Sequence, residues 1–200
     1  MAELPIMLLA AGGSRRMGQA KQLLPWGNST LIEHQVQTLI KTGKPVVVVL
    51  GCQFDRILPI LKTYPVVPLV HTKWQEGMGT SISYGILEVE KEFPEAGGVL
   101  ICQLDQPMIT ASHYNQLLSA FQPGSPQIIV SRSASGWEGV PVLFEREYFK
   151  ELKLLRGEEG ARKIFRSHSS EVIIIQSRDV LEDLDHPEDY ERLLAQYLEK

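Results

Sequence analysis

Small residues and cations gather in one short segment near the start of the chain. Residues 9–18 read Leu-Ala-Ala-Gly-Gly-Ser-Arg-Arg-Met-Gly, and Lys21 follows shortly after them. Alanine and glycine let a ligand approach the backbone closely, and successive N–H groups can surround an anion. The composition favours a polyphosphate site, although a flexible basic turn would look the same. The segment is neither a Walker A loop, because Gln19 and Ala20 replace its lysine and hydroxyl residue, nor a G-x-G-x-x-G dinucleotide fingerprint.

Two aspartates are further candidates for chemistry with a phosphorylated ligand. Asp105 directly follows the apolar run 99–104, at the end of a predicted strand that Pro107 stops. A carboxylate beside phosphates suits Mg²⁺, which takes one or two carboxylates together with phosphate oxygens. The alternative role for Asp105 is to cap the helix predicted after it. Asp185 stands two residues before Pro187 in the pattern of a helix N-cap, and that role accounts for it fully.

Short apolar runs alternate with longer amphipathic stretches between these candidates. The alternation is typical of βαβ units and predicts an α/β fold, with a mainly parallel central sheet and helices on both faces, in one domain over residues 1–200. Ligands of such sheets bind beyond the carboxyl ends of the strands. Glu33 is placed to complete a capping box with Thr30 or Ser29. The predicted strands cover residues 4–9, 45–50, 66–70, 98–104, 127–131, 140–144 and 171–176, and the predicted helices cover residues 30–41, 54–64, 80–91, 111–121, 146–155, 159–167 and 187–199.

The composition excludes several classes of protein. Two hundred residues, of which 44% are hydrophobic and 22% charged, suit one globular domain, and a net charge of -4 argues against a nucleic-acid partner. Cys52 and Cys102 are too few for a disulfide framework or a zinc ribbon, and we expect reduced thiols in a cytoplasmic protein. No apolar run approaches the roughly 18 residues that a membrane helix requires, so we expect no membrane association.

Residues 9–25 resemble the signature L-A-A-G-x-S-x-R-M-G-x-x-K-x-L-L-P of the MobA-like nucleotidyltransferases. Further matches follow in the same order along the chain. Residues 103–107 resemble the L-x-D-Q-P block of this family, and residues 139–144 resemble its G-x-P-V-L-F block. Residues 155–162 resemble its G-D-E-G-A-R block, and residues 183–190 its D-I-D-T-P-E-D-Y block. Within the family, the pattern is most similar to that of the molybdenum cofactor cytidylyltransferases.

The resemblance implies a Rossmann-like nucleotidyltransferase fold and transfer of a nucleotidyl group to a phosphate monoester, with release of pyrophosphate. In the family the first loop holds the triphosphate, and Arg16 and Lys21 would act in catalysis by neutralising the charge that develops there. A magnesium ion would bind Asp105 and, as in related sugar-nucleotide cytidylyltransferases, Asp185, although His186 replaces a commoner threonine here. The implied nucleotide-binding residues are Leu9, Ala10, Ala11, Gly12, Gly13, Ser14, Arg16, Lys21 and Ser81.

The resemblance also suggests which nucleotide and which acceptor the protein uses. Ala11 matches the cytidine-preferring form of the loop, whereas relatives that use guanine nucleotides typically carry glycine there. Gly139 and Pro141 belong to a glycine-bearing loop that could cover a flat heterocycle such as a pterin, and Arg162 near a helix start could hold the acceptor's phosphate. A surface hairpin and a capped surface helix would have the same sequences.

We therefore expect a Mg²⁺-dependent cytidylyltransferase that converts CTP and molybdenum-bound molybdopterin into the cytosine dinucleotide cofactor and pyrophosphate. A molybdenum-containing oxidoreductase is a candidate partner. One alternative keeps the reaction but takes another small phosphate monoester, such as a sugar or polyol phosphate. Another is a non-catalytic chaperone that binds the molybdenum cofactor, and the presence of Arg16, Lys21 and Asp105 together argues against pure binding.

Overall fold

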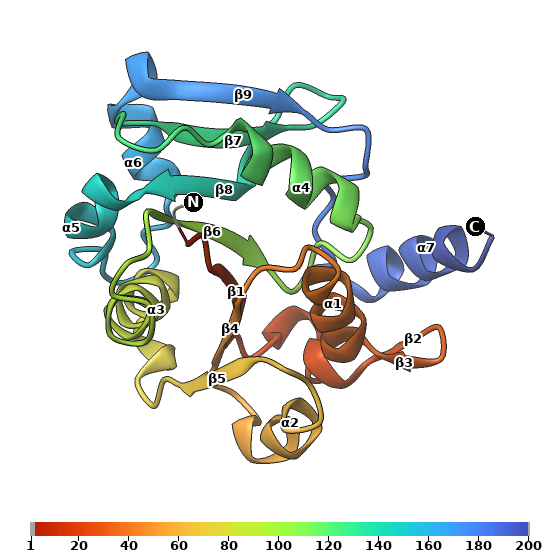
Figure 1. Ribbon diagram of the computed structural model, residues 1–200. Helices are drawn as coiled ribbons and strands as arrows, with labels where there is room; N and C mark the ends of the chain where they lie inside the picture. The colour runs from red at the N-terminus through yellow and green to blue at the C-terminus, as the bar shows by residue number, and fades with distance from the viewer. Residues whose placement is uncertain (1–2, 200) are drawn as a thin grey trace.

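A seven-stranded sheet forms the centre of the computed structural model, which describes residues 3–199 (Figure 1). Its strands lie in the order β5-β4-β1-β6-β8-β7-β9. Among the described residues, β8 is the one strand of this sheet that runs antiparallel to its neighbours. The strands are β1 Ile6–Ala10, β4 Val46–Leu50, β5 Val67–Val70, β6 Gly98–Gln103, β7 Ile128–Arg132, β8 Glu138–Glu145 and β9 Val172–Gln176, and a separate small hairpin pairs β2 Pro25–Trp26 with β3 Ser29–Thr30.

The central strands are apolar because both of their faces are covered. Every residue of β4, with the sequence VVVVL, is buried, as expected for a parallel strand between two helix layers. Pro68 lies in β5, and the strand order explains why it is tolerated there: β5 is at the edge of the sheet, where a missing N–H leaves no inner ladder bond unmade.

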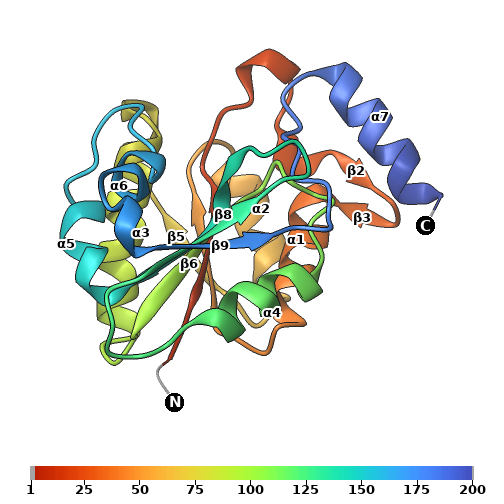
Figure 2. The same ribbon diagram turned by 90° about the horizontal axis from the view of Figure 1, so that it is seen from above.

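Helices cover both faces of the sheet, as predicted (Figure 2). Two hydrophobic clusters divide the core, one on each face. The first face carries α1 Leu31–Ile40, α2 Phe54–Leu61, α4 Ala111–Ala120 and α7 Pro187–Leu198, and the second carries α3 Met78–Glu92, α5 Phe149–Leu152 and α6 Arg162–Ser167. Over residues 3–199, none of these helices has the length and apolar character needed to cross a membrane.

The predicted capping box is confirmed, and two predicted helices prove shorter than expected. Thr30 is the N-cap of α1, and its N–H donates to Glu33 Oε2 at 2.9 Å. The prediction of one helix over 146–155 is wrong in detail, because a 3-10 turn precedes the short α5. The helix predicted over 159–167 begins only at residue 162. Residue 159 instead closes a turn, in which its N–H donates to the carbonyl oxygen of Arg156 at 3.1 Å and Gly157 has the left-handed φ of +55°.

Candidate active site

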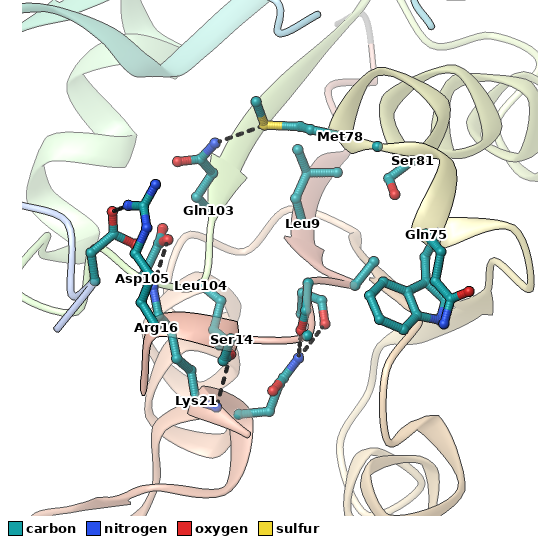
Figure 3. Close-up of a pocket in the computed structure, with 18 of the residues that line it drawn as sticks. Leu9, Ser14, Arg16, Lys21, Gln75, Met78, Ser81, Gln103, Leu104 and Asp105 are labelled. Atoms are coloured by element: carbon teal, nitrogen blue, oxygen red, sulfur yellow. Dashed lines mark hydrogen bonds and ion pairs between the residues drawn. The ribbon is translucent and has the colours of Figure 1, made fainter. Parts of the chain in front are cut away.

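A pocket of about 420 Å³ opens at the carboxyl ends of β1 and β6 (Figure 3), and this volume suits a small-molecule ligand. It contains every residue predicted for the nucleotide and the metal. The lining residues are Leu9, Ala10, Ala11, Gly12, Gly13, Ser14, Arg16, Lys21, Gln22, Trp74, Gln75, Gly77, Met78, Ser81, Gln103, Leu104, Asp105, Glu158 and Asp185. The fold therefore brings segments together at one edge of the sheet that are far apart in the sequence.

Internal donors hold the glycine loop after β1. Gln22, which is 1% exposed, donates through Nε2 to the carbonyl oxygens of Ala10 at 2.8 Å and Gly12 at 2.9 Å. The N–H of Cys52 donates to the carbonyl oxygen of Ala11 at 2.9 Å. These carbonyl dipoles are directed at protein donors rather than at a ligand, which makes the loop more suitable for an anion.

Lys21 lies between the two candidate metal ligands. Its Nζ is 2.8 Å from Asp185 Oδ1 and 3.4 Å from Asp105 Oδ2. Asp185 also accepts from Arg16, whose Nη1 is 2.7 Å from Oδ2. Ser14 supports the lysine, because its Oγ accepts the backbone N–H of Lys21 at 3.1 Å. Two cations and two carboxylates therefore form one connected network at the charged end of the pocket.

The acidic groups of this network differ in their protonation equilibria. The hydrogen bond from Lys21 holds the pKa of Asp185 below its ordinary value, and the Coulombic attraction of Lys21 and Arg16 acts in the same direction. Burial raises the pKa of Asp105, although Lys21 opposes the shift. The neighbouring Asp183 has a pKa of about 6, raised first by desolvation and then by the charge of Asp105. An added positive charge would stabilise the ionised forms of Asp105 and Asp183.

The carboxylates fit a divalent metal ion that shares its coordination with a substrate. Asp105 Oδ1 is buried and has no hydrogen-bond partner among residues 3–199, and an unpaired buried oxygen of this kind is costly unless a ligand satisfies it. The same part of the chain has no group of three or more His, Cys, Asp or Glu residues that could hold a metal alone. Mg²⁺ usually combines one or two carboxylates with phosphate oxygens, which matches a pair of carboxylates beside a glycine loop.

The N-cap interpretation of Asp185 is wrong, because His186 is the N-cap of α7. The N–H of His186 donates to Asp189 Oδ2 at 3.0 Å, which leaves the Asp185 carboxylate to the cations. The N–H of the buried Leu184 donates to the backbone oxygen of Asp105 at 2.7 Å. This bond joins the two aspartate segments directly.

The three residues predicted for the acceptor do not line the pocket among the described residues. The Arg162 guanidinium lies 5.5 Å from the centre of the Trp137 ring, and a side chain at Gly139 would overlap that ring. Pro141 is buried in β8, and its carbonyl oxygen accepts from Ser131 Oγ at 2.6 Å. The role of these residues in acceptor binding stays a prediction.

Sequence reasoning missed several polar residues of the pocket. Gln22 supports the loop, whereas Gln75, Gln103 and Glu158 line the cavity. Gln103 Nε2 approaches Met78 Sδ at 3.3 Å, as Figure 3 shows. Gln22, Gln103 and Glu158 lie within the motifs at residues 9–25, 103–107 and 155–162, which was the available signal.

Comparison with known proteins agrees with this arrangement. The family model described as MobA-like NTP transferase domain matches residues 6–172. Purine catabolism protein PucB of Bacillus subtilis (strain 168) is 28% identical over 92% of this chain and 93% of its own length. Nicotine blue oxidoreductase of Paenarthrobacter nicotinovorans is 28% identical over 94% of this chain and 95% of its own length. Molybdenum cofactor cytidylyltransferase of Escherichia coli (strain K12) is 20% identical over the whole of both chains.

Solved structures show the same fold over nearly the whole chain. A homologue of Mycobacterium tuberculosis Rv0371c from Mycobacterium sp. strain JC1 superposes with a TM-score of 0.82 at 32% identity, covering 98% of this chain and 97% of that one. Rv0371c itself, in complex with manganese, gives a TM-score of 0.80 at 25% identity, covering 97% of this chain and 99% of that one. With its glycine loop, paired cations and adjoining aspartates, the chain belongs to the MobA-like NTP transferase family.

Proposed function

We propose that the protein is a cytidylyltransferase that transfers the CMP group of CTP to the phosphate of molybdenum-bound molybdopterin and releases pyrophosphate. One observation carries the proposal: the glycine loop, the cations Arg16 and Lys21, and the carboxylates Asp105 and Asp185 share one pocket. The whole-length similarity to the Escherichia coli molybdenum cofactor cytidylyltransferase supports this choice of acceptor.

The residues of the pocket suit an in-line displacement at the α-phosphorus. The glycine loop would bind the triphosphate through backbone N–H groups, and Lys21 and Arg16 would stabilise the charge that passes to the leaving pyrophosphate. The acceptor's phosphate oxygen would form the new P–O bond while the bond to pyrophosphate breaks. No covalent enzyme intermediate is needed, so positioning and electrostatic stabilisation supply the rate enhancement.

A divalent cation, which we infer to be Mg²⁺, would bind Asp105 and Asp185 together with phosphate oxygens. Nucleotidyltransferases of this type commonly use a divalent metal, and Rv0371c has been solved with manganese. The unpartnered Oδ1 of Asp105 supports this assignment. When bound, the ion would supply positive charge to the phosphates, in addition to that of Lys21, which contacts both carboxylates.

The nucleotide preference is inferred from Ala11. Its side chain is buried at the pocket, where a methyl group limits how a larger purine can lie. We further infer that the domain comprises residues 1–200 and works in the reducing cytoplasm, where the unpaired thiols of Cys52 and Cys102 are stable. The product would pass to a molybdenum-containing oxidoreductase.

The test is a screen for pyrophosphate release. CTP, GTP, ATP and UTP are each combined with the molybdenum cofactor and with several sugar and polyol phosphates, in the presence of MgCl₂. Rapid release of pyrophosphate from the combination of CTP and the molybdenum cofactor, and from no other combination, supports the proposal. Turnover with a sugar phosphate instead would identify another acceptor. Tight binding of the molybdenum cofactor without any turnover would favour a chaperone over an enzyme.

A further inference from the structure

The indole of Trp74 lines the pocket and packs against two loops, which carry Gly13 and Gly51. A Cβ atom built on Gly13 would lie 3.0 and 3.1 Å from Cη2 and Cζ3 of the indole. A Cβ atom on Gly51 would lie 2.5 Å from its Cγ. Both loops therefore carry glycine at the positions where the tryptophan packs, and one side chain contacts the segments that follow β1 and β4.

Hydrogen bonds fix the backbone segment that carries Trp74. The carbonyl oxygen of Trp74 accepts the N–H of Gly77 at 3.2 Å, and Thr80 Oγ1 donates to the carbonyl oxygen of Gly77 at 2.8 Å. His71 is also buried, and its Nε2 lies 3.1 Å from Thr80 Oγ1. These bonds join the segment that carries Trp74 to the first turn of α3.

A second loop presses against the same turn. The N–H of Gly79 donates to the carbonyl oxygen of Gly157 at 2.8 Å, and a side chain at Gly77 would overlap that carbonyl. Backbone packed this closely has little freedom to move. Trp74 thus extends from a rigid support toward the glycine loop.

Gly12 and Gly13 are adjacent in the glycine loop, but their surroundings differ. A Cβ atom on Gly12 would meet nothing within 4 Å among the described residues, whereas one on Gly13 would meet the indole. Gln22 and Cys52 hold only the backbone carbonyl groups of residues 10–12. At Gly13 the loop therefore lies against Cη2 and Cζ3 of the Trp74 indole.

We infer that Trp74 is a positioning residue for the nucleotide: it holds the loop at Gly13 in register with Ser81 on α3, so that both sides of the pocket fit one ligand. The inference rests on the proposed nucleotide site. The indole acts through the loop, and its loss would let the N–H groups of the loop move relative to the phosphates. Displacements of about 1 Å from such changes can cost up to 10²-fold in function.

Substitutions at three positions test this contact. In Trp74→Phe the ring keeps Cβ and Cγ but loses the atoms that approach Gly13. Gly13→Ala should weaken the binding of CTP with MgCl₂ by roughly tenfold in the wild-type background, because the loop must shift away from the indole. In the Trp74→Phe background the same substitution should cost much less. Gly51→Ala should stay harmful with phenylalanine, since its Cβ would approach the retained Cγ and the carbonyl oxygen of Ala11.

Gly12→Ala is the matched control. It also adds a methyl group to the loop, but its effect on binding should be the same with tryptophan or phenylalanine at position 74. Binding is measured by isothermal titration calorimetry without an acceptor, and thermal unfolding shows that each variant is folded. Trp74→Ala, which removes the support completely, should raise the dissociation constant by roughly tenfold, with Trp74→Phe between it and wild type.

The outcomes distinguish a failure of the role proposed for Trp74 from a failure of the proposed function. If wild type binds CTP and the effects of Gly13→Ala and Trp74→Phe are additive, the positioning role is wrong and the nucleotide site stands. If Gly12→Ala couples to position 74 as strongly as Gly13→Ala does, the contact is not specific and the inference fails. If none of the four nucleoside triphosphates binds wild type, the proposed function and the role of Trp74 fail together.

Discussion

Lys21 is a buried cation, 8% exposed, rather than a free side chain on a loop. Its position in a loop-like sequence suggests that its removal would hardly disturb the protein. In the structure it separates Asp105 from Asp185, so that two carboxylates would face each other without it. The lysine therefore has an electrostatic role in the free protein as well as the proposed role during the reaction.

Lys21→Ala should reduce turnover by roughly 10²- to 10³-fold, because one cation is withdrawn from the transition state. It should also raise the pKa of Asp105 further, since the charge and hydrogen bond of Lys21 are the main influences that lower it. Steady-state rates of pyrophosphate release and the pH dependence of metal binding measure the two effects. Near-wild-type turnover by a folded variant would remove Lys21 from the catalytic machinery.

Asp185→Asn should impair activity while leaving folding almost intact. The carboxylate takes no part in capping α7, its ion pair with Arg16 is partly exposed, and the amide Oδ1 can still accept from Lys21, which keeps its ion pair with Asp105, so the free energy of unfolding should change by no more than about 2 kcal/mol. Asp189→Ala is the opposite control: it removes the acceptor of the His186 N–H and should cost about 1 kcal/mol without loss of turnover. Full activity of Asp185→Asn would leave Asp105 as the one proposed carboxylate ligand.

Asp105→Asn should abolish metal-dependent turnover, because the amide keeps the shape of the side chain but not its charge. Increasing MgCl₂ should not restore the rate to that of wild type. Manganese titration by calorimetry, in the presence of CTP, gives a readout that does not depend on turnover. Unchanged manganese affinity in this variant would show that the ion binds elsewhere.

At the scale of elements, local sequence patterns predicted some helices and strands correctly but could not predict features that depend on distant residues. Helix α1 was predictable because its cap, Thr30 with Glu33, is encoded within four residues. The antiparallel direction of β8 was not, since its apolar sequence fits either direction and pairing with β6 depends on distant residues. The separation of α5 from α6 was predicted, but the start of α6 at residue 162 rather than 159 was not, because the preceding turn around Gly157 depends on packing against the first turn of α3.

The capping box of α1 offers a test of stability away from the site. Glu33 accepts the N–H of Thr30, and Tyr64 Oη donates to its second oxygen at 3.2 Å. Glu33→Ala should lower the free energy of unfolding by about 1 kcal/mol, through loss of the cap and of this bond. Urea unfolding measures the change, and turnover at 25 °C should equal that of wild type. A loss of activity in a fully folded variant would contradict this separation of roles.

At the scale of the whole molecule, two buried histidines and one half-buried histidine should make the fold sensitive to acid. Burial lowers the pKa of His34, His71 and His113 below 6.5, whereas the unfolded chain takes up these protons at about pH 6.5. Their contribution to stability is therefore present above pH 6.5 and is lost as the pH falls. Asp183, with a raised pKa of about 6, acts in the opposite direction as the pH falls through that value.

A comparison of wild type with His113→Gln isolates one of these groups. His113 is 2% exposed and lies 2.8 Å from Ser131 Oγ. Between pH 7.5 and 5, the free energy of unfolding should fall more steeply for wild type than for the variant. The contribution of Asp183 cancels in the difference. Equal slopes in urea unfolding would show that His113 does not contribute.

The site was predictable wherever its residues follow strands of the sheet. The loop after β1 and Asp105 after β6 must share an edge in any parallel α/β sheet. The approach of Asp185 to Lys21 was not predictable from spacing, because it depends on how the segment before α7 crosses the end of the sheet. The packing of Arg162 on Trp137 was also not predictable from spacing, because tertiary contacts set these loop conformations, and the role of these residues in acceptor binding is still untested.

The bond between Leu184 and Asp105 has a consequence for the protein during its synthesis. A ribosome makes the glycine loop, Lys21 and Asp105 long before Asp185, which follows Lys21 by 164 residues. While the segment around Leu184 is still in the exit tunnel, the nascent chain lacks one carboxylate of the network. A molecule in this state therefore cannot assemble the complete charged end of the pocket, and competence for the proposed reaction arises only after this late segment has left the tunnel.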